Sequence, residues 1–91
     1  MGIEEFVANR KAVEEKMKAR DVSDEAYNLY LSIVKLAEQI RATKIDKPGY
    51  TPDDMKTFLL EVYGALKMCA MQKRNSELIK EFNTRISALE G

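Results

Sequence analysis

Apolar residues recur at spacings of three and four along most of this 91-residue chain, and no segment alternates apolar with polar residues. The first pattern is that of one face of an α-helix, whereas alternation is the pattern of a half-buried strand. A chain of this length forms one domain at most. We therefore expect residues 1–91 to form a single all-α domain, a small three- or four-helix bundle without a sheet.

Four segments carry this period, and several begin with a recognisable cap. The expected helices cover about 3–20, 24–42, 52–72 and 76–89. Ser23 is suited to cap the second helix, because its side chain can accept a hydrogen bond from the first turn. At the third helix, Thr51 and Asp54 form a capping box and Pro52 occupies the first helical position.

The connections between the helices differ in strength. Pro48-Gly49 suits the two central positions of a type II turn and marks a true break. Residues 73–76 are compatible with helix, so the last two segments are either separate helices or one long helix. We favour the break, because a continuous helix would bring Lys73 onto the core face. The short links at about 21–23 and 73–75 predict mostly antiparallel neighbours.

Composition argues against most catalytic and metal chemistry. The chain has no histidine and one cysteine, Cys69. It therefore lacks the commonest general acid–base and metal ligand, and it cannot form a cysteine-rich zinc site or an internal disulfide. Cys69 falls on the core face of its helix, which favours a buried apolar role. We expect no enzymatic activity, no cofactor and no bound metal.

Adjacent carboxylates occur four times and could suggest acid–base or magnesium chemistry. The pairs are Glu4-Glu5, Glu14-Glu15, Asp24-Glu25 and Asp53-Asp54. Three of these pairs fall in the first turn of an expected helix, where negative charge is stabilised by the helix dipole. Neighbouring residues also do not share a helix face. We interpret the pairs as helix-start residues.

Charge and hydropathy narrow the possible partners. Lys plus Arg and Asp plus Glu both total 15, so the formal net charge is zero. No stretch approaches the ~18 apolar residues of a membrane span, and the N-terminus lacks the apolar run of a signal peptide. A lone thiol fits a reducing compartment. We expect a cytoplasmic protein that does not bind membranes.

Two basic surfaces support an alternative, a small nucleic-acid-binding regulator. The first is the basic end of the first helix, and the second is the surface of the fourth helix. Their residues are Arg10, Lys11, Lys16, Lys18 and Arg20, and Lys80, Asn83, Thr84 and Arg85. Acidic residues are interleaved with both groups, and no aromatic platform accompanies them, so a solvated face is the simpler interpretation.

Surplus apolar residues on the second and third helices are the most informative feature. Leu60, Met68 and Met71 lie opposite the expected core face of the third helix, with Gly64 among them, and Tyr27 and Leu31 lie beside the main face of the second. Exposed apolar patches mark association sites, and glycine lets another helix approach closely. These six residues form the expected interface. The leading hypothesis is a non-enzymatic interaction, regulatory or adaptor module that forms a homodimer or binds a protein partner.

Overall fold

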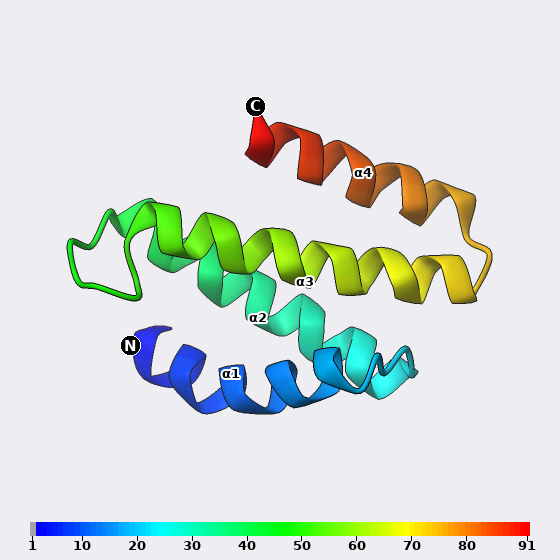
Figure 1. Cartoon of the computed structure of the whole chain (residues 1–91), viewed down its shortest axis with the longest axis horizontal. Helices are drawn as coiled ribbons and strands as arrows, with labels where there is room; N and C mark the ends of the chain where they lie inside the picture. Colours follow the sequence, from blue (N-terminus) through cyan, green and yellow to red (C-terminus); the bar gives the residue numbers. More distant parts are fainter. Residues whose placement is uncertain (1) are drawn as a thin grey trace.

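The computed structural model describes residues 2–91 and contains four α-helices, with no strand in that range. They are α1 (Gly2–Lys18), α2 (Asp24–Thr43), α3 (Pro52–Gln72) and α4 (Ser76–Glu90). Successive helices run in opposite directions, which gives an all-α four-helix bundle (Figure 1). The predicted fold class and the antiparallel order are therefore confirmed. None of the described helices is long and apolar enough to cross a membrane.

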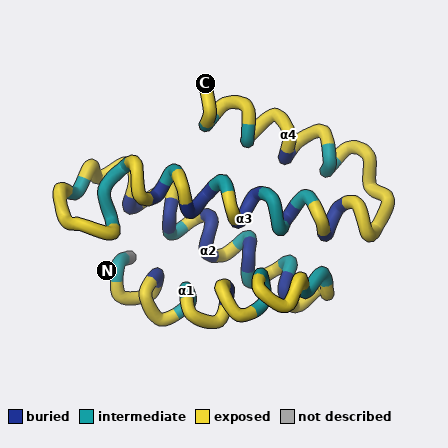
Figure 2. Tube along the Cα trace, viewed as in Figure 1, coloured by how far each residue is buried: buried dark blue, intermediate teal, exposed yellow. Residues whose placement is uncertain are grey.

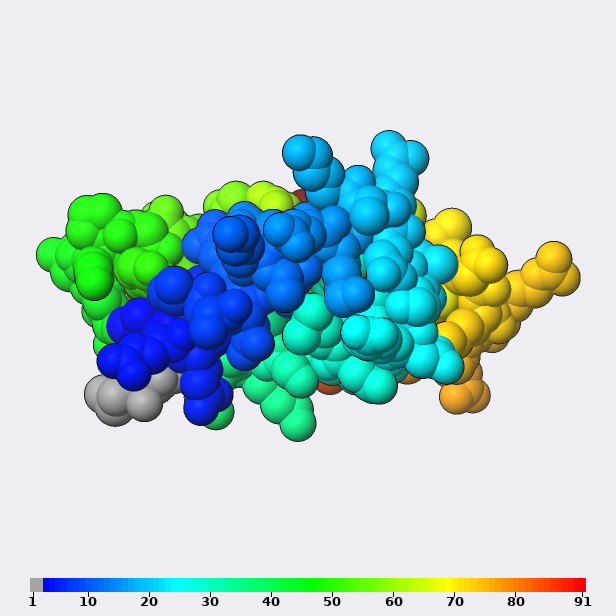
Figure 3. Space-filling view, turned by 90° about the horizontal axis from the view of Figure 1, so that it is seen from below, coloured from blue at the N-terminus to red at the C-terminus, as the bar shows by residue number. Residues whose placement is uncertain are grey.

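Extensive helix packing is confined to consecutive pairs. α1 packs on α2, α2 on α3, and α3 on α4. The two central helices therefore have neighbours on two sides, whereas α4 is held almost entirely by α3 (Figure 1). On the side away from α4, α1 covers the middle of the surface, and the connecting segments and the end of α3 show beyond it (Figure 3). This order leaves the outer helices exposed along much of their length.

The core follows the same division. Buried residues line α2 and α3 along most of their length, whereas the single fully buried residue among those described in α4 is Phe82 (Figure 2). α1 contributes Phe6 and Val13, and the Phe6 ring packs edge-on against Phe58 with centroids 5.1 Å apart. No charged side chain within residues 3–91 is buried, and the hydroxyls of the buried Tyr30 and Tyr63 both donate hydrogen bonds. Apolar burial therefore holds the fold together.

α1 ends two residues earlier than the pattern predicts, at Lys18 and not at Arg20. Arg20 adopts a left-handed backbone conformation with φ of 54°. The amide of Asp21 then donates to the Lys16 carbonyl at 2.9 Å, and that of Arg20 donates to Met17 at 3.0 Å. This pair of bonds is a Schellman motif, which satisfies the last carbonyls of the helix. The predicted end at Arg20 was wrong because the sequence pattern gives no signal that a helix ends when the terminating residue is not glycine.

The break between α3 and α4 uses the same device, and the prediction of two separate helices is confirmed. Arg74 has φ of 54°, and the amide of Asn75 donates to the Ala70 carbonyl at 3.0 Å. Asn75 then caps α4, because its side-chain oxygen accepts from the Leu78 amide at 3.2 Å. One tight turn thus ends α3 and starts α4 in the opposite direction.

The longer connection between α2 and α3 also folds as its residues predict. Gly49 has φ of 93°, and the amide of Tyr50 donates to the Lys47 carbonyl at 2.9 Å, which closes a turn around Pro48-Gly49. Thr51 and Asp54 form the reciprocal capping box of α3. Ser23 likewise caps α2 by accepting from Ala26 at 3.2 Å. These local signals fix where the two central helices begin.

Candidate functional site

The six predicted interface residues fall into two groups in the structure. Leu60, Gly64, Met68 and Met71 follow one another on α3 at intervals of three and four, so they form one stripe. Tyr27 and Leu31 lie on α2 and pack against the core. We call the four α3 residues the α3 stripe. The structure does not merge the two groups into one surface, because the α3 stripe lies opposite the α3 residues that face the core.

The α3 stripe is the more accessible group. Met68 is 42% exposed and Met71 is 55% exposed, and Leu60 and Gly64 are half-buried. A Cβ atom added to Gly64 would meet nothing within 4 Å. No contact within the chain therefore requires glycine at this position, although glycine inside a helix costs about 0.5–1 kcal/mol relative to alanine. The stripe is an apolar surface with open space above its centre.

Tyr27 and Leu31 are half-buried and already have partners. The Lys73 ammonium lies 4.9 Å from the centroid of the Tyr27 ring and forms an ion pair with Asp24. The hydrogen bond with Asp24 raises the pKa of Lys73 above its ordinary value. This cluster joins the end of α3 to the start of α2, so Tyr27 contributes to holding the central pair together.

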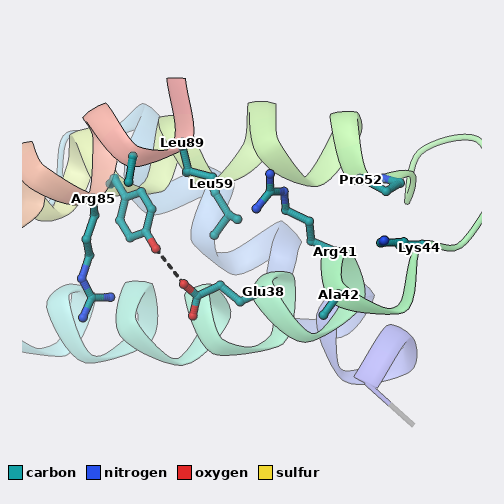
Figure 4. Close-up of a pocket in the computed structure, with 10 residues that line it drawn as sticks. Glu38, Arg41, Ala42, Lys44, Pro52, Leu59, Arg85 and Leu89 are labelled. Atoms are coloured by element: carbon teal, nitrogen blue, oxygen red, sulfur yellow. Dashed lines mark hydrogen bonds between the residues drawn. The ribbon is translucent and has the colours of Figure 1, made fainter. Parts of the chain in front are cut away.

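A groove separates α2 from α4 above α3. Its volume is about 810 Å³. The lining residues are Glu38, Arg41, Ala42, Lys44, Pro52, Leu59, Tyr63, Arg85, Ala88 and Leu89 (Figure 4). Leu59 and Tyr63 are only 1% and 2% exposed and form its floor. The groove exists because α4 packs on α3 and leaves α2 uncovered on that side.

A hydrogen bond crosses one end of this groove. The Tyr63 hydroxyl donates to Oε2 of Glu38 at 2.9 Å (Figure 4). Burial is the largest cause that raises the pKa of the Tyr63 hydroxyl above its usual value, and the hydrogen bond to the Glu38 carboxylate is the second. The hydroxyl therefore stays protonated and acts as the donor. The Arg85 side chain extends from α4 toward α2 beside the same pair (Figure 4).

The groove was not foreseen as a site from the sequence. Tyr63 reads as a core residue and Arg85 as a surface cation, and both descriptions are correct locally. A signal was nevertheless present on α2, since Glu38 continues the row of Tyr27, Leu31 and Val34 at helical spacing. A carboxylate on that row indicates a partly polar neighbour. Which segment forms this polar neighbour depends on where α4 docks, and helical periodicity does not define that position.

No group of three or more Cys, Asp or Glu side chains within residues 2–91 is placed to hold a metal ion. Cys69 is fully buried, and burial raises the pKa of its thiol, which disfavours the nucleophilic thiolate. Asp21 and Asp54 have lowered pKa values, because hydrogen bonds with Ser23 and Thr51 stabilise their charged forms. Lowered values suit capping carboxylates and oppose a role as general acids.

The basic residues of α1 are partly engaged within the chain. The Arg10 guanidinium pairs with Glu14 at 3.4 Å and lies 4.9 Å from the centroid of the Phe58 ring. Lys16 lies 3.4 Å from a carboxylate oxygen of Asp21 and 4.0 Å from one of Glu25. These ion pairs reduce the charge that α1 presents to phosphates.

Comparison of the chain with known protein families, curated proteins and solved structures gives no match.

Proposed function

We propose that this chain is a non-enzymatic helical interaction module that forms a homodimer through the α3 stripe. The observation that carries the proposal is the exposure of Met68 and Met71 beside the open space above Gly64. Methionine side chains adapt to a facing surface, and they are enriched at protein interfaces. A second copy that packed its own stripe against this one would form a two-fold symmetric, self-complementary contact.

Gly64 supports the geometry of this contact. An isolated exposed methionine is common on a protein surface and indicates little. A glycine between apolar residues in the middle of a helix is less expected, because it costs stability with no return inside the monomer. Close approach of a second helix backbone gives it a function. Zero net charge leaves little long-range repulsion between two copies.

We also propose a cytoplasmic location, supported by the free buried Cys69. A nucleic-acid regulator is the alternative function, and it has weaker support. Arg10 and Lys16 are paired with carboxylates on α1, and Arg85 lies 3.9 Å from Glu81 on α4. The remaining cations share their surfaces with exposed acidic residues. A steep salt dependence of binding to generic DNA or RNA would favour that alternative.

The test compares two substitutions of exposed apolar residues. Met71→Glu places a charge on the α3 stripe, whereas Val7→Glu places one on α1, where the side chain is 49% exposed. Both variants should keep the far-ultraviolet circular dichroism of the native chain. We expect Met71→Glu to raise the dimer dissociation constant about tenfold or more, which corresponds to roughly 1.4 kcal/mol, while Val7→Glu leaves it unchanged. Equal effects of the two substitutions would contradict the assignment of the interface to α3.

A further inference from the structure

The groove between α2 and α4 has an apolar floor and a cationic rim that the homodimer contact does not use. We propose that it binds an amphipathic helix of a protein partner, one that carries carboxylates beside its apolar stripe. This inference rests on the proposed function as an interaction module. It concerns a different face of the molecule, so the two can fail separately.

The apolar lining fits the apolar stripe of a helix. Leu59 and Tyr63 from α3 are almost completely covered at the bottom, so the accessible apolar surface comes from Ala42, Ala88 and the half-buried Pro52 and Leu89. Exposed alanines, Ala42 and Ala88, stand on opposite sides, and their small side chains leave the groove open between the two helices. Helix-in-groove recognition uses such a surface, with apolar anchors at i, i+3 or i+4 and i+7.

The dimensions agree with this occupant. The lined part of α3 runs from Pro52 to Tyr63, so the groove is roughly 16 Å long at 1.5 Å per residue. A helix of about three turns lies along this length, and the volume of about 810 Å³ admits several large side chains. Because α4 packs on α3 alone, small movements of α4 can adjust the width of the groove.

The charges select the kind of helix. Arg41, Lys44 and Arg85 border the groove, and its one lining carboxylate is Glu38, which accepts the Tyr63 hydroxyl. Arg85 already pairs with Glu81 at 3.9 Å, so Arg41 and Lys44 carry the free charge. Arg41 and Lys44 are exposed and form no ion pair within residues 2–91. Both residues lie at the C-terminal end of α2, where positive charges interact favourably with the helix dipole. A partner helix with Glu or Asp beside its apolar stripe would supply the missing counter-charges and fix its register.

A second copy of the chain suits the groove less well. The free apolar surface that a copy offers is the α3 stripe, and Lys67 lies between Gly64 and Met71 on the same side of that helix. Lys56 lies one turn before Leu60. Bringing these lysines to a rim formed by Arg41 and Lys44 would place like charges together, which opposes binding.

The test uses two synthetic helical peptides of about 18 residues, long enough to span the groove. Both carry leucine at i, i+4, i+7 and i+11; one has glutamate beside the leucines and the other has lysine. Binding to the full chain is measured by fluorescence anisotropy. We expect the acidic peptide to bind and the basic peptide to bind at least about tenfold more weakly, which corresponds to roughly 1.4 kcal/mol. Failure of both peptides to bind, or equal binding, would overturn the proposal.

Variants locate the binding surface. Arg41→Glu/Lys44→Glu should weaken binding of the acidic peptide about fivefold to tenfold, because two exposed cations are replaced by anions that repel the carboxylates of the peptide. Lys11→Glu/Lys18→Glu on α1 changes the net charge equally and should have little effect. Amide chemical shifts should change near residues 38–44 and 85–89. Shifts confined to residues 60–71 would overturn the groove assignment while supporting the interaction function.

A binding measurement with duplex DNA tests the remaining explanation, that the cationic rim binds phosphates. If generic DNA bound the chain and Arg41→Glu/Lys44→Glu removed that binding, the rim would serve phosphates, and the helix proposal would be wrong. Dimer formation is measured in the same samples by sedimentation. A dimer that does not bind the acidic peptide refutes only this inference, and a monomer that binds it refutes only the homodimer.

Discussion

The hydroxyl of Tyr63 on α3 donates a hydrogen bond of 2.9 Å to Oε2 of Glu38 on α2, across 25 residues of sequence. The phenol ring is buried, while the carboxylate is exposed to solvent. The bond therefore joins the two central helices at the point where the floor of the groove meets its edge. It is one of two hydrogen bonds formed by the hydroxyls of buried tyrosines; the other joins Tyr30 to the Asp21 carbonyl at 2.8 Å.

Removing the hydroxyl with Tyr63→Phe should lower the free energy of unfolding by about 0.5–1.5 kcal/mol, the net contribution of a typical hydrogen bond. The loss of stability should stay in this range, because Glu38 is exposed and water takes the place of the Tyr63 hydroxyl. Urea unfolding measures the change. The control is Tyr50→Phe, since the Tyr50 hydroxyl forms no hydrogen bond within residues 2–91, and it should alter stability much less. A larger loss in the control would show that the Glu38 contact does not contribute.

α4 should open before the rest of the bundle, because it packs on α3 alone and buries one side chain completely. Amide hydrogen exchange should show lower protection in α4 than in α2 and α3. Phe82→Ala should remove most of the remaining protection of α4, since truncating a buried phenylalanine costs about 3–5 kcal/mol. The core of α2 and α3 should stay protected in that variant. Loss of protection in all four helices together would show that α4 is integral to the core.

Gly64→Ala should raise the free energy of unfolding of the monomer by about 0.5–1 kcal/mol, because the added methyl meets open space and stiffens the unfolded chain. The measurement uses a Met71→Glu background, so that association does not add to stability. Gly49→Ala is the matched control and should destabilise the chain by about 1 kcal/mol, since φ at Gly49 is 93°. In the native background, Gly64→Ala should weaken the dimer; unchanged dimerisation would argue against close approach at this residue.

Acid should destabilise the fold through two capping carboxylates. Hydrogen bonds with Ser23 lower the pKa of Asp21, and hydrogen bonds with Thr51 and Gly49 lower the pKa of Asp54, both below the ordinary value of 3.8. A lowered folded-state pKa gives stability that is complete above the unfolded-state pKa of about 4 and is lost as the pH falls through the folded-state value. The thermal unfolding midpoint should therefore decrease as the pH is lowered below about 4.

Asp54→Asn in the first turn of α3 should flatten this acid dependence, whereas Asp46→Asn, in the exposed connection before α3, should leave it nearly unchanged. The measurement is the thermal midpoint between about pH 2 and pH 6, which brackets the carboxylate range. If Asp54→Asn retained the full acid dependence, the capping box would not be its source.

Local chemistry explains why the four helices and their starts could be predicted. Ser23, Thr51 and Asp54 act on residues within one turn of themselves, so sequence spacing alone defines their partners. The end of α1 was missed because the left-handed residue there is Arg20, and arginine carries no signal for that conformation. Helix ends that depend on an unusual residue in a Schellman motif are determined by competing backbone hydrogen bonds.

The two candidate sites differ in the same way, because one can be predicted from local sequence and the other cannot. The α3 stripe is visible in the sequence because Leu60, Gly64, Met68 and Met71 share one helical face. The groove is not, because it requires that α4 dock on α3 and leave α2 uncovered. That outcome depends on the burial of Phe82 where α4 packs on α3, which is a tertiary property. Periodicity identifies which face is apolar but not which neighbour covers it.

Sedimentation equilibrium of the native chain at micromolar concentration tests the homodimer directly. We expect a mass near twice the 10.4 kDa of one chain, which falls to that of one chain in the Met68→Glu/Met71→Glu variant while the helical content is preserved. A native chain that sediments as a monomer of 10.4 kDa at every concentration would contradict a homodimer built on α3.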